Sequence, residues 1–393
     1  MKDRKKKRIS PWVAVLTGVA GLVVGGGVLF AVMWSSLGGP GMTLVQAYQI
    51  ISHRFVGDYD PQESLEATLG AMVDSLGDRW SYYLTPEEAR QVKEARQNSY
   101  VGIGITVSRD STDGLHIQSV TRGGPADEAG IQAGEIICAV DGVAVTQENR
   151  EDSIARIKGE EGSVLTLEVQ GSDGARRSVE VTRKTVHGIS AQWHMMDNGI
   201  GRINIYNFYS GTAEQVRTGV EELMEQGARA LVFDVRNNPG GYVTELTAML
   251  DFLLPEGRIF VSQEYNGKET VYTSDASCVS LPMAVLVNGE SYSAAEFFAA
   301  QLRESVDAVV AGTKTSGKGY SQMLFSLQDG SAIGLSTARY FTGSGVSLIG
   351  TGLDPDPSVE LTEAAKEKLL LGQLPESEDL QLQAAVKALH LEG

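Results

Sequence analysis

Ser293 and Lys318 lie 25 residues apart, and each has the surroundings that a serine peptidase working without histidine requires. A serine hydroxyl is a weak nucleophile and needs a base at the working pH. A lysine amine serves as that base only where an apolar, water-poor position disfavours its charge. Lys318 follows the apolar segment 309–311 among small residues, and Gln322 is placed to orient the amine. This spacing predicts acyl transfer by a serine–lysine pair.

The setting of Ser293 also allows a purely structural interpretation. The residue follows a strand-like segment at 284–287 and begins the predicted helix 294–303. With Glu296 three positions later it fits a capping box, in which the serine merely satisfies a helix amide. Ser291 is a second candidate nucleophile. The residues by themselves leave these alternatives open.

A third segment, 231–241, supplies a turn rich in bare amides. Its strand-like start, Leu-Val-Phe-Asp-Val, runs into Asn-Asn-Pro-Gly-Gly at 237–241. Such a sharp turn exposes backbone N–H groups, which an oxyanion hole requires. The candidate donors are the amides of Gly240, Gly241 and Ala294. An ordinary strand-to-helix loop is the alternative.

Residues 100–185 consist of short β-like runs broken by glycine, which predicts a small, mostly β domain. The runs at 123–137 and 140–142 make this region resemble a PDZ domain. The resemblance implies that Gly102, Ile103, Gly104 and Ile105 form the loop that accepts a peptide's terminal carboxylate. The following strand then pairs with the peptide backbone.

The remaining chain predicts an α/β multidomain protein. Helical periodicity extends over 43–95, where Thr85 and Glu88 form a capping box, and a further helix is predicted at 380–389. Strand-like and helix-like segments alternate from 200 to 359, which is typical of an α/β layer fold. The alternating segments are 230–235, 243–254, 283–287, 294–303 and 306–311.

These motifs occur in the order and spacing of the carboxy-terminal processing peptidases, the S41 serine peptidases, which the chain resembles over residues 43–390. The runs that carry the resemblance are 78–84, 234–241, 288–296, 317–322, 329–331, 337–342 and 350–356. Tyr292, Ala295 and Gly343 depart from the usual pattern, and Tyr292 is expected to narrow the pocket.

The resemblance implies a crotonase-like α/β peptidase core with Ser293 as nucleophile, Lys318 as general base and Gln322 as the residue that orients the base. It also implies cleavage of C-terminal tails of proteins, with the tail bound and the activity gated by the PDZ domain. A homodimer follows by family analogy, and no cofactor is implied. The expected division is 1–38 basic stub and transmembrane anchor, 43–98 helical region, 100–185 PDZ domain, 190–360 peptidase core and 361–393 C-terminal helical tail.

The N-terminus predicts a membrane anchor. The first eight residues carry +5, and residues 11–34 carry no charge. As a helix this stretch spans roughly 36 Å, enough for a hydrocarbon core of ~30 Å. The basic cluster predicts a cytoplasmic N-terminus and a catalytic domain outside the cytoplasm, on a single-pass cell-membrane protein. A cleaved signal peptide is the alternative, although the apolar stretch is longer than the usual signal core.

Composition excludes several other classes. The net charge of −17, and −22 after the basic cluster, argues against a nucleic-acid partner. Cys138 and Cys278 are expected to be separate buried thiols, and the five histidines show no metal-ligand spacing. The segment 312–318 resembles a phosphate loop, but Gly319 stands where its magnesium-binding hydroxyl belongs. The remaining alternative is a catalytically inactive PDZ-based protein that binds tails at the membrane.

Overall fold

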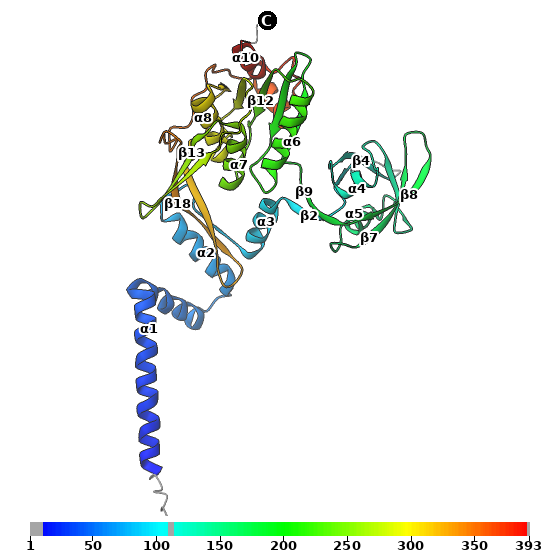
Figure 1. The fold of residues 1–393 in the computed structure, drawn as a ribbon. Helices are drawn as coiled ribbons and strands as arrows, with labels where there is room; N and C mark the ends of the chain where they lie inside the picture. Colours follow the sequence, from blue (N-terminus) through cyan, green and yellow to red (C-terminus); the bar gives the residue numbers. More distant parts are fainter. Residues whose placement is uncertain (1–10, 109–113, 391–393) are drawn as a thin grey trace, which may run out of the picture. The chain divides into compact units, whose positions relative to one another are not determined.

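The computed structural model describes residues 11–108 and 114–390, and it divides into two compact units, Met1–Ser75 and Leu76–Gly393 (Figure 1). The first unit contains α1 (Pro11–Arg54) and α2 (Pro61–Asp74). Two helices are joined in α1 across Gly38, whose φ of 60° breaks the helical path. The break falls in the Gly-Gly-Pro-Gly run that the sequence marks as a helix breaker.

The helical conformation expected for residues 11–34, the predicted transmembrane anchor, is present. Among the residues that the structure describes, no helix has both the length and the apolar character needed to cross a membrane. The basic cluster within residues 1–10 lies outside the described residues.

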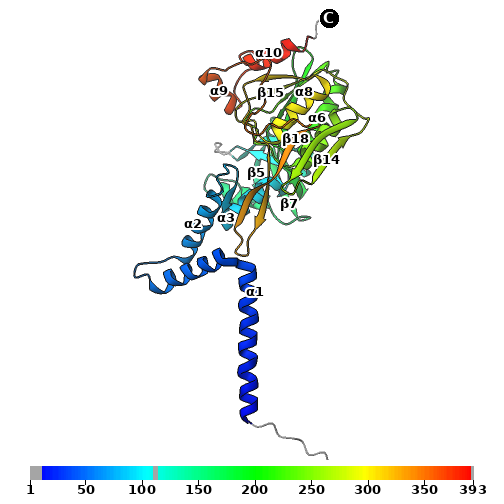
Figure 2. The ribbon, with the colours of Figure 1, turned by 90° about the vertical axis from the view of Figure 1, so that its left-hand side faces the viewer.

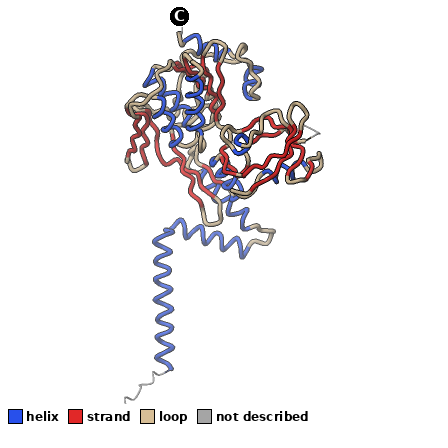
Figure 3. The backbone as a smooth tube through the Cα atoms, turned by 45° about the vertical axis from the view of Figure 1, so that its right-hand side comes forward, coloured by secondary structure: helices blue, strands red, loops and turns tan. Residues whose placement is uncertain are grey.

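The second unit contains a β-rich domain with its own hydrophobic core. Its sheet has the strand order β3-β4-β5-β7-β8, with β6 paired to β5, while β2 and β9 form a separate antiparallel pair. Figure 3 shows this domain as mostly strand. Ile103, Leu115, Ile137 and Leu167 are fully buried in its core. The elements are β2 (Ser99–Gly102), β3 (Ile105–Val107), β4 (Leu115–Val120), α4 (Pro125–Glu128), β5 (Ile136–Val140), β6 (Val143–Ala144), α5 (Arg150–Ile157), β7 (Val164–Gln170), β8 (Arg176–Thr182) and β9 (Lys184–His187).

The chain continues into a five-stranded sheet of order β10-β11-β12-β15-β16, parallel except for the antiparallel β10–β11 pair. Alternate residues of each strand face opposite sides, because the side-chain period of a strand is two. Phe233 and Val285 therefore pack with α6, α7 and α8, whereas Val232 and Ala284 pack with α10. Figure 2 labels β15 of this sheet together with α6, α8 and α10. The elements are β10 (Ala191–Met195), β11 (Ile200–Ile205), α6 (Thr212–Glu225), β12 (Ala230–Asp234), α7 (Val243–Leu253), β15 (Met283–Val287), α8 (Ala294–Val306), β16 (Val309–Gly312), α9 (Glu363–Leu370) and α10 (Leu380–Ala388).

A second sheet of order β1-β18-β13-β14, with β17 paired to β18, closes the far side of the helical layer. Phe260 of β13 and Tyr340 of β18 pack edge-on against Phe297 of α8, which joins this sheet to the same core. The elements are β1 (Tyr82–Leu84), α3 (Pro86–Gln97), β13 (Gly257–Glu264), β14 (Glu269–Ser274), β17 (Tyr320–Ser326) and β18 (Ala332–Thr342).

Most expected segments are present, with two corrections. The last predicted strand, 306–311, begins only at Val309, since α8 continues to Val306 and Asp307 ends it in the left-handed conformation. Cys138 and Cys278 are free thiols, as expected, but neither is fully buried: Cys138 is half-buried, and Cys278 is exposed because it lies in a loop after β14. The capping box of Thr85 and Glu88 is confirmed, with the Thr85 N–H donating to Glu88 Oε2 at 2.9 Å.

Candidate active site

Three neighbouring parallel strands, β12, β15 and β16, end at the same edge of the central sheet. The segments that follow them carry the predicted turn 237–241, Ser293 and Lys318, respectively. Ligands of open parallel sheets bind outside the carboxyl ends of the strands, where such loops converge. The sheet topology therefore brings together the three segments that the sequence separates by up to 80 residues.

Ser293 stands at the start of α8 in an unusual backbone conformation, with φ 59° and ψ −125°. A non-glycine residue at positive φ is strained and persists only where its surroundings hold it. Gly240 is pressed against it: a Cβ on Gly240 would lie 3.0 Å from the Ser293 Cβ and 2.9 Å from the Ala294 nitrogen. Glycine is therefore required at 240 if the turn is to lie beside this serine.

Ser291, the second candidate, has a structural role. Its hydroxyl donates to the Val235 carbonyl at 2.7 Å and accepts the Asn288 N–H at 3.0 Å, and the residue is fully buried. These bonds tie the end of β15 to the end of β12. Its oxygen is therefore not available to a substrate.

Glu296, which the sequence suggested only as a capping-box partner, is the centre of the site's hydrogen bonding. Its fully buried carboxylate accepts the Ser293 N–H at 2.9 Å, which is the cap contact. It also accepts the Lys318 N–H at 2.8 Å, the Gly317 N–H at 2.7 Å and the Thr315 hydroxyl at 2.5 Å. One carboxylate therefore holds the backbones of both candidate catalytic residues.

Lys318 extends its amine between two aromatic rings. Its Nζ lies 4.6 Å from the centre of the Trp80 ring and 5.3 Å from that of Tyr292. Burial, and then the nearby charge of Arg96, lower the pKa of Lys318 to about 8, against smaller opposing effects of Glu296 and Asp78. In the described part of the chain the amine has neither a hydrogen-bond acceptor nor an ion-pair partner.

Ser293 and Lys318 line one pocket of about 180 Å³. Gln322 also lines it, but its amide nitrogen donates to the Tyr320 carbonyl at 3.2 Å and to the Ser336 hydroxyl at 3.3 Å. Among the described residues no hydrogen bond joins Gln322 to Lys318, so the predicted orienting contact is absent from this structure. The other residues around the pocket are Arg96, Tyr209, Pro239, Gly240, Gly241, Tyr242, Tyr292, Tyr320, Ser321 and Tyr340.

Of the three amides predicted as oxyanion donors, two are free to donate to a substrate. The Gly240 N–H donates to Asn238 Oδ1 at 2.8 Å, which corrects the prediction for that amide. The N–H groups of Gly241 and Ala294 have no acceptor within the described residues. Free amides beside the nucleophile are the groups that can stabilise developing negative charge.

Trp80 and Arg96 are parts of the site that sequence reasoning did not identify. Trp80 belongs to the Asp-Arg-Trp-Ser run, where the Asp78 carboxylate accepts its N–H at 3.1 Å and the Ser81 hydroxyl at 2.6 Å. An aromatic residue in a turn held by such an Asx contact was the available signal. For Arg96, on the amphipathic helix α3, the sequence contains no comparable signal.

The predicted peptide-binding residues lie away from this pocket, in the β-rich domain. Ile103 is fully buried, and its carbonyl accepts the Ala126 N–H at 2.9 Å, while Gly104 has a φ of 77°. Ile105 begins β3, which pairs only with β4 among the described strands, so its other edge is unpaired. An unpaired edge is what strand addition by a peptide requires.

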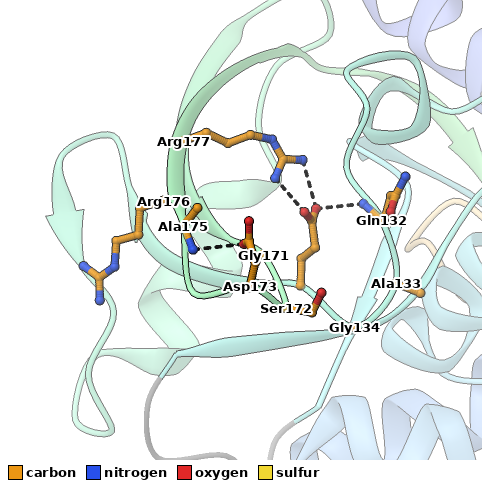
Figure 4. A pocket seen from close by; sticks show the side chains of 10 residues that line it. Gln132, Ala133, Gly134, Gly171, Ser172, Asp173, Ala175, Arg176 and Arg177 are labelled. Carbon is orange, nitrogen blue, oxygen red and sulfur yellow. Dashed lines mark hydrogen bonds and ion pairs between the residues drawn. The ribbon is translucent and has the colours of Figure 1, made fainter.

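A separate pocket in the β-rich domain has a structural explanation (Figure 4). Arg177 donates to Glu135 at 2.6 and 3.0 Å, and the Glu135 carboxylate also accepts the Gln132 N–H. None of the predicted peptide-binding residues lines it. In the described chain, no group of three or more histidine, cysteine, aspartate or glutamate side chains is arranged to hold a metal ion.

The role of Glu296 in holding the site is testable through stability. In Glu296→Gln an amide NH2 replaces one acceptor oxygen and faces backbone donors, so we expect the free energy of unfolding to fall by about 1.5–3 kcal/mol. Chemical denaturation measures this loss. Glu304→Gln changes an exposed carboxylate of the same helix whose one bond, from the Ser344 N–H, the amide oxygen can still accept, so stability is expected to change by no more than about 0.5 kcal/mol. Equal effects of the two substitutions would contradict the interpretation.

Comparison with known proteins agrees with these motifs. The model of peptidase family S41 matches residues 199–359, and that of the PDZ domain matches residues 91–170. The carboxy-terminal processing protease CtpA of Bacillus subtilis is 31% identical over 325 residues, which cover 82% of this chain and 70% of that protein. A probable CtpA-like serine protease of Staphylococcus aureus is 30% identical over 319 residues, which cover 80% of this chain and 63% of the relative.

Among solved structures, the photosystem II D1 C-terminal processing protease aligns with a TM-score of 0.48 at 25% identity, covering 85% of this chain and 92% of that one. An S41 protease of Bacteroides fragilis aligns with a TM-score of 0.49 at 19% identity. On the sequence matches, the chain belongs to the carboxy-terminal processing serine peptidases of family S41, and it carries a PDZ domain.

Proposed function

We propose that this protein is a serine endopeptidase with a serine–lysine dyad and that it cleaves C-terminal tails of proteins. The observation that carries the proposal is the shared pocket, in which Ser293 faces the same space as a lysine whose pKa is lowered to about 8. A base titrating near the working pH is the most effective general base.

In the proposed reaction, the Ser293 hydroxyl attacks the peptide carbonyl while Lys318 takes its proton. The carbonyl oxygen becomes negative and is bound by the N–H groups of Gly241 and Ala294. Lys318 then returns the proton to the leaving amine, and the C–N bond breaks. A water molecule, activated by the same neutral amine, releases the acyl group and restores Ser293.

We further propose that the PDZ domain binds the substrate's tail and gates the peptidase. The open edge of β3 and the left-handed Gly104 next to it support this assignment. A tail added at that edge gains main-chain hydrogen bonds, and its terminal carboxylate is accepted by loop amides.

The proposed location rests on charge distribution in the sequence. The uncharged segment 11–34 follows a strongly basic start, and everything after it is acidic overall. We propose that this segment anchors the protein in the cell membrane and leaves the peptidase outside the cytoplasm.

The dyad predicts a characteristic pH dependence. Lys318 must be neutral to act as a base, so kcat/KM is expected to rise about tenfold per pH unit below pH 8 and to level off above it. We expect Lys318→Ala to lose roughly 10²–10⁴-fold in rate. Lys314→Ala is the matched control, because Lys314 is an exposed lysine of the same loop, paired with Asp354. If wild type and Lys318→Ala behaved alike, the protein would be the inactive tail-binding alternative.

The PDZ assignment predicts that tail recognition can be removed without unfolding the peptidase. Gly102 and Lys184 are paired across β2 and β9, so an Asn-Gly turn in place of residues 103–183 should close a short hairpin. No residue of that segment belongs to the peptidase core clusters. The variant should lose the preference for substrates with a free terminus. Unchanged turnover and unchanged substrate range would exclude both binding and gating by this domain.

The anchor predicts a difference between the full chain and a chain beginning at residue 39. The full chain should remain with membranes after carbonate extraction and be digested by protease added outside intact cells, because the peptidase lies beyond the bilayer. The shortened chain should be extracted freely yet cleave peptides at the same rate. Recovery of the full chain in the carbonate-soluble fraction would refute the anchor, and an N-terminus cleaved near residue 38 would indicate a signal peptide.

A further inference from the structure

A second pocket, of about 310 Å³, continues the active-site pocket toward α3. The two pockets share Gly241 and Tyr242 of the glycine turn, Ser321 and Gln322 of β17, Tyr340 and Arg96. Beyond this shared wall the second pocket is lined by Val92, Lys93, Val243 and Leu324. A groove therefore extends from Ser293 and Lys318 to helix α3. We call it the α3 groove.

The α3 groove has a charge opposite to that of the protein as a whole. The chain carries −17, but the residues lining the two pockets include the cations Lys93, Arg96 and Lys318 and no carboxylate. A cleft of one sign within a protein of the other sign attracts ligands of complementary charge.

Arg96 is the cation at the junction of the two pockets. It is half-buried, and its guanidinium has one hydrogen bond, a long one of 3.4 Å to the Tyr82 hydroxyl. Within the described residues it forms no ion pair. Arg90, on the same helix, shows the usual alternative: it pairs with Glu87 at 2.6 Å and with Glu94 at 2.7 Å. Arg96 thus lines both pockets and is paired with no carboxylate of the described residues.

We propose that Arg96 binds a carboxylate of the substrate in the α3 groove, so that the enzyme prefers peptides with negative charge close to the cleaved bond. This rests on the proposed peptidase function. The planar guanidinium offers two parallel N–H donors to a carboxylate, and such bidentate pairs add geometric specificity to the charge attraction. The carboxylate is that of an aspartate or glutamate side chain or the terminal one of a short product segment.

The like charge of Arg96 also contributes to the lowered pKa of Lys318, together with Arg79 and against Glu296 and Asp78. Removal of Arg96 is therefore expected to raise that pKa and to shift the pH–rate profile upward. Selectivity must be measured above the titration of Lys318 in every variant, where this effect no longer changes the rate.

The test compares kcat/KM for matched peptides that contain one cleaved bond. In one series a glutamine near that bond is replaced by glutamate at successive positions. In another pair, measured in the variant that lacks residues 103–183 so that the PDZ domain cannot bind the terminus, a terminus that falls close to the bond is either free or amidated. Wild type is expected to prefer the acidic member of at least one pair by about tenfold, equivalent to ~1.4 kcal/mol. Arg96→Gln should reduce this ratio to about one, and Arg96→Lys, which keeps the charge without the fork, should give an intermediate ratio.

Arg90→Gln is the control, because it removes the same charge from the same helix outside the groove; it should preserve the wild-type rate and ratio. If Arg96→Gln lowers the kcat/KM ratio in the glutamate series, the bound group is a side-chain carboxylate. If it lowers the ratio only for the free and amidated pair, the bound group is the terminal carboxylate. A ratio near one for all pairs in wild type, or a ratio that Arg96→Gln leaves unchanged, overturns the proposal.

Failure of the proposed function would look different, because neutral peptides would then show no cleavage that depends on Lys318. The preference for a carboxylate can still be measured in that case as binding. Fluorescence anisotropy with Ser293→Ala should give a Kd about tenfold lower for the acidic peptide, and Ser293→Ala combined with Arg96→Gln should bind both peptides equally. Equal Kd values in the single variant would refute the proposal independently of catalysis.

Discussion

The carboxylate of Glu296 is the interaction on which the active site depends. It lies one helical turn into α8, and it accepts hydrogen bonds from the backbone that carries Ser293 and from the loop that carries Lys318. One further backbone bond, from the Ser316 N–H to the Ser291 carbonyl at 3.3 Å, joins the same two loops. A buried carboxylate is costly unless its oxygens are satisfied, and here backbone N–H groups and the Thr315 hydroxyl satisfy them. The hydrogen bonds that satisfy the buried carboxylate therefore also fix the backbones of Ser293 and Lys318 relative to each other.

The second constraint on the site is the lack of space between the glycine turn and Ser293. The turn after β12 reaches Ser293 only because residue 240 has no side chain, and the Gly241 N–H that follows it has no acceptor among the described residues. Behind the turn, the guanidinium of Arg236 joins Asp234 at 2.6 Å to Asp379 at 2.7 Å, all of them buried. This pair of contacts connects the strand end to the segment that begins α10. The C-terminal helix thus supports the turn from the opposite face of the sheet.

The two basic residues at the junction of the pockets, Lys318 and Arg96, differ in their electrostatic properties. The amine of Lys318 is partly buried beside the rings of Trp80 and Tyr292 and lies near the charge of Arg96. Burial and this charge lower the pKa of Lys318, so that its neutral form is populated near pH 8. Arg96 carries a planar guanidinium with a rigid fork of donors. One cation is therefore suited to move a proton and the other to donate hydrogen bonds. Both residues line a pocket that contains no carboxylate among the described residues, within a chain whose net charge is −17.

Residue types and short-range spacing determined much of this protein: the strands and helices around 230–310, the capping box at Thr85, the glycine turn, and Ser293 and Lys318 as a chemically matched pair. These features follow from local patterns, in which period, turn chemistry and cap residues act over a few positions. The roles of Glu296, Trp80 and Arg96 were decided by tertiary structure alone. Each belongs to a different element, and no local pattern records which distant backbone or side chain it will meet. The occupied amide of Gly240 and the displaced contact of Gln322 have the same origin, because a hydrogen bond depends on ångström-scale positions that only the packed fold provides.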